Sequence, residues 1–137
     1  MSSLIRIGLL ACIALVGCSV AEVPQQEPLN HPLITVTSPL PGDRITSPLT
    51  IKGQARGTWY FEATFPVVLT DWDGLIIAQG YAQAEGEWMT EDFVPFSATL
   101  TFEKPAYGER GTLVLQKDNP SGLPEHDDAV EIPIRFE

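Results

Sequence analysis

The stretch Val94-Pro-Phe-Ser-Ala-Thr-Leu-Thr-Phe102 decides the fold, because an apolar side chain occupies every second position in it. A period of two is the pattern of a β-strand with one buried face. Working outward, shorter runs with the same alternation lie at 34–37, 49–56, 65–69, 112–116 and 130–136, and 75–82 is expected to return as the partner strand after Asp73-Gly74. No segment has a helical period of useful length. About seven short strands separated by turn signals predict an all-β fold in which two sheets pack as a sandwich.

The connections and small residues add local predictions. Asp73-Gly74 lies between two apolar runs, and Asp-Gly is typical of a type I′ hairpin turn, whose two central residues both need positive φ. Pro133 cannot donate to a strand ladder, so we expect the last strand at a sheet edge. Gly53 and Ala55 predict that another backbone or a large ring packs closely against the second strand.

Residues 1–17 have the features of a lipoprotein signal peptide. Arg6 precedes an apolar run, 7–16, that is shorter than the roughly 20 residues of a bilayer-spanning helix. Leu15-Val16-Gly17-Cys18 resembles a bacterial lipobox. We therefore expect cleavage before Cys18 and acylation (palmitate) of that cysteine, which would hold the protein on an extracytoplasmic membrane face, at the cell surface or in the periplasm. The alternative is a signal peptide cut elsewhere, or an uncleaved anchor.

The charge of the chain restricts its partners. Eighteen Asp and Glu residues stand against eight Lys and Arg, for a net charge of −10, and loss of Arg6 with the leader would make the mature chain one unit more acidic. Nucleic acid and anionic lipid both attract Lys/Arg clusters, so we expect no nucleic-acid partner and membrane contact only through the lipid on Cys18. Cys12 lies in the leader, which leaves no thiol for a disulfide, a zinc site or a nucleophile.

The mature chain divides into two parts. Residues 18–32 comprise the lipidated cysteine and a flexible linker with prolines and no apolar period. Residues 33–137 have the length of one domain.

Acidic residues in two loops could provide a metal site. Asp71, Asp73, Asp118, Asp127 and Asp128 could supply oxygen ligands for Ca²⁺ if their loops met. The Asp-x-Asp-x-Asp-Gly pattern of a calcium loop is absent, and acidic turn residues usually make local hydrogen bonds. We therefore predict no metal and no other cofactor.

The sequence contains only weak signals for catalytic groups. Ser121, His126 and Asp127 share one loop without the Gly-x-Ser-x-Gly elbow that presents a nucleophile. Two carboxylate pairs could suit a glycosidase, but neighbours on a polar connection are more typical of a solvated face. These pairs are Glu85 with Glu87 and Glu91 with Asp92. We therefore predict that the protein is not an enzyme.

Aromatic residues fall in or beside the connections, where they either plug the open ends of the sandwich or bind a partner. The plug is favoured because Trp59-Tyr60-Phe61 is expected to face Gly53 and Ala55. For a partner, the sequence predicts a surface at one end of the sandwich, formed by the Trp59 region, the Trp72 hairpin and the loop 118–128. Its candidate residues are Trp59, Tyr60, Trp72, Asp73, Trp88, His126 and Asp127.

Several segments together resemble the Gmad2 family, the immunoglobulin-like domain of bacterial spore germination. They are Ile34–Gly42, Gly53–Gly57, Trp59–Glu62, Phe65–Val67, Asp73-Gly74, Trp88–Phe93 and Gly111–Ile134, in order over residues 33–136. The resemblance implies an immunoglobulin-like β-sandwich and an extracytoplasmic accessory role. It supplies no catalytic or binding residues, and a part in germination follows from the family name only.

These observations together predict a lipid-anchored, non-enzymatic protein of the bacterial cell envelope with one immunoglobulin-like domain. We expect it to serve in protein interaction, adhesion or assembly, with an unknown envelope protein as partner. The alternative is a module that binds glycan or peptidoglycan through the loop aromatics Trp72 and Trp88.

Overall fold

The computed structural model describes residues 12–13, 17 and 29–137. Cys18 and most of the predicted signal peptide and linker lie outside these residues, so lipidation stays a prediction. Within the described ranges, no helix has the length and apolar character needed to cross a membrane.

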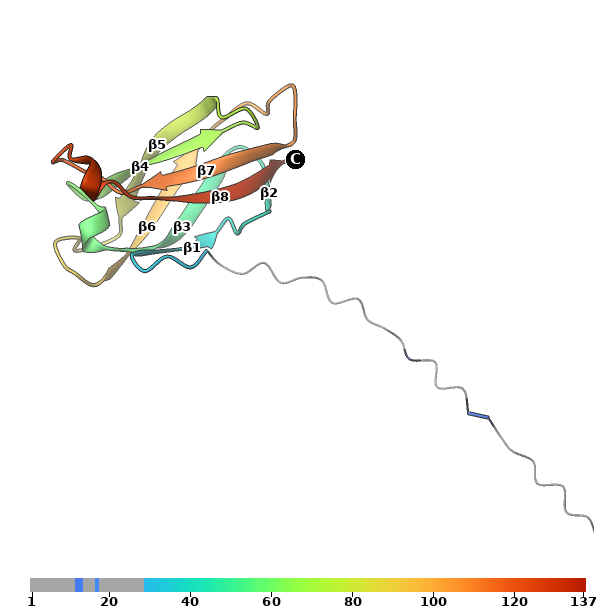
Figure 1. Cartoon of the computed structure of the whole chain (residues 1–137), viewed down its shortest axis with the longest axis horizontal. Helices are drawn as coiled ribbons and strands as arrows, with labels where there is room; N and C mark the ends of the chain where they lie inside the picture. Colours follow the sequence, from blue (N-terminus) through green and yellow to red (C-terminus); the bar gives the residue numbers. More distant parts are fainter. Residues whose placement is uncertain (1–11, 14–16, 18–28) are drawn as a thin grey trace, which may run out of the picture.

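Eight strands and two short 3₁₀ helices make up the domain (Figure 1). In chain order they are β1 (Ile34–Ser38), β2 (Arg44–Ile45), β3 (Leu49–Arg56), η1 (Gly57–Trp59), β4 (Thr64–Thr70), β5 (Ile76–Ala84), β6 (Phe93–Leu100), β7 (Arg110–Gln116), η2 (Pro124–His126) and β8 (Ala129–Phe136). The prediction of an all-β fold is confirmed. The seven expected strands are present, and the two-residue β2 is additional.

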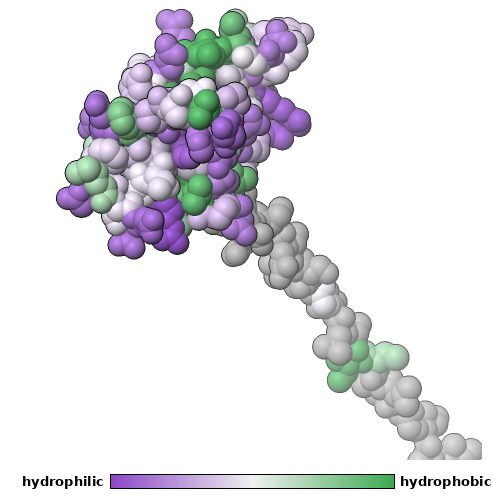
Figure 2. Space-filling model, turned by 60° about the vertical axis from the view of Figure 1, so that its left-hand side comes forward, coloured by the Kyte–Doolittle hydropathy of each residue, from purple (hydrophilic) through white to green (hydrophobic). Residues whose placement is uncertain are grey.

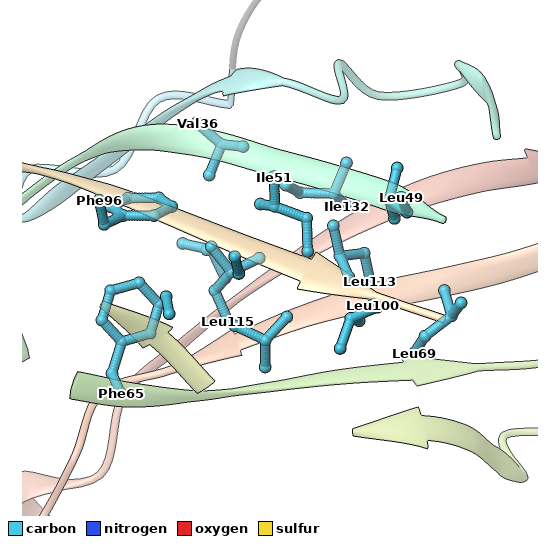
Figure 3. Packing of buried hydrophobic residues seen from close by; sticks show 14 of the residues in the cluster. Val36, Leu49, Ile51, Phe65, Leu69, Phe96, Leu100, Leu113, Leu115 and Ile132 are labelled. Atoms are coloured by element: carbon cyan, nitrogen blue, oxygen red, sulfur yellow. The ribbon is translucent and has the colours of Figure 1, made fainter. Parts of the chain in front are cut away.

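The strands form one curled sheet in the order β1-β3-β6-β5-β4-β7-β8-β2. The sheet folds over so that β1, β3 and β6 face β4, β7 and β8 across the core (Figure 3). β5 joins the two layers, because it pairs with β4 along its length and with β6 only at Gln83 and Ala84. The two sheets expected from the sequence are therefore continuous through β5.

The core lies between the layers and is filled by the alternate residues of the strands. Phe96 and Leu100 of β6 point toward Phe65 and Leu69 of β4, with Leu115 of β7 beside them (Figure 3). No charged residue is buried within residues 29–137. Burying a large apolar side chain contributes roughly 1.5–3 kcal/mol, so this core can hold the domain without a disulfide.

Gly53 shows why the second strand needs a small residue. A Cβ at Gly53 would collide with the carbonyl oxygen of Thr35 on β1 and would lie 2.9 Å from Cζ of Phe96. Both the close backbone and the large ring predicted from the sequence are present. The ring belongs to Phe96, on the neighbouring strand β6, and not to the segment Trp59-Tyr60-Phe61.

The hairpin between β4 and β5 corrects the predicted turn type. Only Gly74 has positive φ, and its N–H donates to the carbonyl oxygen of Asp71 at 3.1 Å. The N–H of Asp71 donates to the carbonyl oxygen of Leu75 at 2.9 Å, so the geometry is that of a longer hairpin loop in which Gly74 forms a bulge. The register of β4 with β5 shifts separately, between Leu69 and Thr70. Asp71 Oδ1 also accepts the N–H groups of Asp73 and Leu75, each at 2.9 Å.

The two edges of the curled sheet are irregular. β1 has a bulge between Val36 and Ser38. At the other edge, β2 pairs only with Arg135 and Phe136 of β8. The N–H of Gly42 donates to the carbonyl oxygen of Pro133 at 2.7 Å, so the ring nitrogen of Pro133 faces outward, away from β7. β8 is thus next to the edge, and its proline lies where no strand needs an N–H donor.

The connections gather at two opposite ends of the sandwich (Figure 1). The helical end comprises residues 57–63, 85–92 and 117–128 and contains η1 and η2. The arginine end comprises residues 39–48, 71–75 and 101–109, with Arg110 and Arg135 at the adjoining strand ends. Because β4 and β7 are antiparallel, the end of β4 meets the start of β7, which separates the Trp72 hairpin from the loop 117–128.

Candidate functional site

Trp59 and Tyr60 are core residues of the helical end. Trp59 is 0% exposed and Tyr60 is 4% exposed, and both rings pack edge-on against Phe65. The hydroxyl of Tyr60 donates to the carbonyl oxygen of Val94 at 2.6 Å, and burial raises the pKa of Tyr60 above its usual value. The plug interpretation is therefore confirmed for this pair. Neither side chain can touch a partner, which corrects their inclusion in a binding surface.

His31 lies against this plug, although the sequence placed it in the linker. Its ring contacts Trp59 edge-on at 5.3 Å between centroids. Nδ1 accepts the N–H of Leu33 at 3.1 Å, and Nε2 lies 3.2 Å from Oδ2 of Asp128. Leu29 also packs against the core. The ordered contacts thus begin before residue 33. A single histidine in a proline-bearing segment has no sequence signal for this docking.

The loop 117–128 is organised by Asn119. Its Nδ2 donates to the carbonyl oxygen of Leu123 at 2.8 Å and to Oδ1 of Asp127 at 2.7 Å. The hydroxyl of Ser121 donates to Oδ1 of the same asparagine. Ser121 and Asp127 therefore bind Asn119, and His126 is exposed with its backbone in η2. These contacts stabilise the loop and do not form a hydrolytic group.

The loop 85–92 is attached to the helical end by Arg56. Its guanidinium lies 4.0 Å from the ring centroid of Phe93 and donates to the carbonyl oxygen of Glu91 at 3.2 Å. Gly57 has no room for a Cβ, because the carbonyl oxygens of Trp88 and Thr90 lie against it. Trp88 is half-buried against the core.

The candidate carboxylate pairs lie on the outside of this loop. Glu85, Glu87 and Asp92 line an open hollow of about 340 Å³, and Glu91 is exposed outside it. These four carboxylates thus lie on a solvated face, which is the interpretation that the sequence favoured over a glycosidase pair. The side of the molecule turned forward in Figure 2 likewise shows small hydrophobic patches separated by hydrophilic residues.

Trp72 and Asp73 lie at the arginine end, opposite the other candidates. The predicted single binding surface is therefore wrong: Trp88, His126 and Asp127 lie at the helical end. Trp72 and Trp88 cannot form one platform for a sugar. The two acidic loops also do not meet, and no three His, Cys, Asp or Glu side chains of the described residues converge on a metal position.

Trp72 is held in a fixed position although it is exposed. Its side chain is 56% exposed, and its ring lies 6.1 Å from that of Tyr107, which is 78% exposed. Gly108 has φ +82°, and a Cβ there would collide with Cδ1 of Trp72. The indole therefore rests on the Gly108 backbone beside Tyr107 and presents its remaining surface to solvent.

A groove of about 580 Å³ lies beside Trp72 on the outer face of β7 and β8. Asp71, Trp72, Thr112 and Pro133 line it, and Arg110 and Arg135 supply its positive charge. Asp71 contributes its carboxylate to the turn, where Oδ1 accepts two backbone N–H groups.

Three arginines form a row next to this groove. Arg110 is the register partner of Arg135, and Arg135 is the register partner of Arg44 on β2. Their side chains share the outer face, because Ile45, Gly111 and Phe136 beside them point into the core. The row has no signal in the sequence, because its members lie far apart in the chain and Arg44 is on the unexpected β2.

Comparison with known families is informative for the fold. Residues 33–123 match the family model Gmad2, immunoglobulin-like domain of bacterial spore germination. No curated protein and no solved structure matches the chain. The family match covers more than half of the chain and confirms the expected resemblance and the immunoglobulin-like fold. The chain therefore belongs to the Gmad2 family.

Proposed function

We propose that this Gmad2 domain is the binding module of a lipid-anchored, non-enzymatic envelope protein, and that it contacts its partner through the arginine end. The role is adhesion, scaffolding or assembly outside the cytoplasm. One observation carries the proposal: Trp72 and Tyr107 are exposed side by side at a groove, whereas Trp59 and Tyr60 at the helical end are buried. Exposed aromatic residues beside arginine are typical of binding surfaces.

The non-enzymatic character is supported by the family and by the candidate residues themselves. The chain matches an immunoglobulin-like domain family, which is generally non-catalytic. In this chain, the candidate residues Ser121 and Asp127 hydrogen-bond to Asn119, which stabilises the loop 117–128.

The lipid anchor is tested by Cys18→Ala. We expect loss of acylation and release of the protein from the membrane fraction, measured by palmitate labelling and by fractionation. Cys12→Ala is the matched control and should leave both unchanged, because Cys12 lies in the predicted leader. Retention of the Cys18→Ala protein in the membrane would refute the anchor.

The binding end is tested by photo-crosslinking on whole cells. A photoreactive phenylalanine analogue replaces Tyr107 at the arginine end or Phe61 at the helical end, where Phe61 is 41% exposed. We expect a discrete adduct, with protein or glycan, from position 107 only, and its loss when Trp72→Ala is added. Adducts from position 61 alone would move the binding surface to the helical end.

A further inference from the structure

We propose that the groove at the arginine end binds an acidic glycan, with Trp72 against a sugar ring and Arg110 and Arg135 on its carboxylate or phosphate groups. This inference rests on the proposed function, because it names the chemistry of the partner that the same end would contact.

The arrangement of the arginines is the first argument. Like charges directly opposite each other on neighbouring strands destabilise a sheet, yet Arg44, Arg135 and Arg110 occupy one row. The chain has only eight Lys and Arg in total. Three of them are therefore concentrated at one place in an otherwise acidic protein, where an external anion would relieve their mutual repulsion.

The availability of these arginines is the second argument. Arg56 and Lys117 at the helical end donate hydrogen bonds to backbone carbonyl groups. Within residues 29–137, the row arginines form no ion pair and no side-chain hydrogen bond, although Asp71 lines the same groove. A planar guanidinium matches a carboxylate or phosphate with two parallel hydrogen bonds.

Two acidic side chains at the arginine end accept hydrogen bonds from backbone N–H groups of their own loops. Asp71 Oδ1 accepts two N–H groups of its own turn. Asp43 Oδ2 accepts the N–H of Leu40 at 2.8 Å. These carboxylates stabilise the loops that frame the groove, and the row arginines keep their donors for a ligand.

Trp72 distinguishes a glycan from an acidic polypeptide. An aromatic ring with one open face can stack on the C–H face of a sugar, while its other side is supported. Trp72 has this geometry, because it is 56% exposed and rests on the backbone of Gly108. Charge attraction alone would require the arginines but not a fixed, exposed indole.

The test is a titration of the purified full-length protein with defined polymers, followed by calorimetry. The ligands are an oligomer of uronic acid, a sugar-phosphate oligomer, an uncharged glucose oligomer of equal length and poly-glutamate. We expect one of the two acidic glycans to bind at least about tenfold more tightly than the neutral glycan and poly-glutamate. The preferred acidic glycan identifies the acidic group as carboxylate or phosphate.

Matched variants locate the site. Trp72→Ala, and Arg110→Gln with Arg135→Gln, should each weaken binding of the acidic glycan by about tenfold or more. Lys52→Gln with Lys117→Gln removes the same charge elsewhere and should leave the affinity within about twofold, because exposed charges farther away are screened by salt. Thermal melts confirm that each variant is folded.

Two results would overturn the inference. Equal binding of poly-glutamate and the acidic glycans, unaffected by Trp72→Ala, would assign the row to an acidic polypeptide. Absence of binding to both acidic glycans would also refute it. If crosslinking from position 107 persisted in either case, the proposed function would stand and only the glycan chemistry would fail.

Discussion

Trp59 at the helical end is fully buried beneath His31, whereas Trp72 at the arginine end is 56% exposed beside Tyr107. The charged residues differ in the same way. Arg56 at the helical end holds a neighbouring loop, and Arg110 and Arg135 at the arginine end have no protein partner among the described residues. Tryptophan and arginine side chains therefore pack against the protein at the helical end and are available to a ligand at the arginine end. The residue types in a loop therefore do not tell whether the loop packs on the core or binds a partner. The strand pairing around the loop decides this.

The largest expected difference between the ends is in stability. Trp59→Ala should lower the free energy of unfolding by about 3–5 kcal/mol, because it removes a buried ring and leaves a cavity. Trp72→Ala should cost at most about 1 kcal/mol, since over half of that side chain is in solvent. Urea denaturation measures both. If the Trp59→Ala protein does not fold, the same comparison is made with Trp59→Phe and Trp72→Phe. Equal losses of unfolding free energy at the two positions would contradict the difference between the ends.

A pair of glycines tests whether Trp72 is positioned by its support. Gly108 and Gly122 both have positive φ, but only at Gly108 would a Cβ collide with another residue, Trp72. Gly122→Ala should cost about 1–2 kcal/mol from backbone strain. Gly108→Ala should cost about 1 kcal/mol more and change the tryptophan fluorescence, because the indole must move. Identical losses and unchanged fluorescence would show that Trp72 is not held by Gly108.

The helical end contains a strained turn that can be relieved. Glu62 and Ala63 have φ +50° and φ +65°, and Phe61 and Thr64 exchange two backbone hydrogen bonds around them. This is a two-residue turn with positive φ at both positions, for which Asn-Gly is favoured. Glu62→Asn with Ala63→Gly should raise the free energy of unfolding by about 1 kcal/mol. The thermal midpoint measures the gain, and a loss would mean that the glutamate side chain stabilises the turn.

Alkaline pH should act through Tyr60. Burial raises the pKa of Tyr60, so the folded state keeps the phenol protonated, while the unfolded chain ionises near pH 10. The resulting stability is complete below about pH 10 and is lost as the pH rises beyond it. Tyr60→Phe should cost about 1 kcal/mol at neutral pH, through the lost hydrogen bond to Val94, and should flatten the alkaline decline. Tyr107→Phe is the control at an exposed site, and it should leave both the stability at neutral pH and its alkaline decline unchanged.

The strands were predictable because their burial alternates. Val94 to Leu100 shows the alternation in sequence, and the same residues of β6 alternate between buried and outward-facing positions in the structure. β2 could not be found this way, since two residues carry no period. Asp73-Gly74 correctly marked a hairpin, but the dipeptide fits more than one turn type. The backbone conformation decides between them, because only Gly74 has positive φ in this turn.

The site was less predictable because it depends on long-range pairing. Trp72 was found as an aromatic residue in a connection, but its separation from Trp88 and His126 follows from the antiparallel pairing of β4 with β7. The arginine row requires the register of three strands, and Arg44 lies on the strand that was not expected. Likewise, the burial of Trp59 under His31 depends on a segment that reads as a linker.

The irregular edges of the sheet have a consequence for neighbouring copies of the protein. An edge strand with regular, free N–H and C=O groups is a template for adding strands from another molecule. Here the bulge interrupts β1, and at the opposite edge β2 is only two residues long and Pro133 faces outward. Neither edge offers a long, regular ladder. Copies held side by side, as the proposed lipid anchor would hold them, would therefore resist edge-to-edge aggregation while their loops stay free to bind.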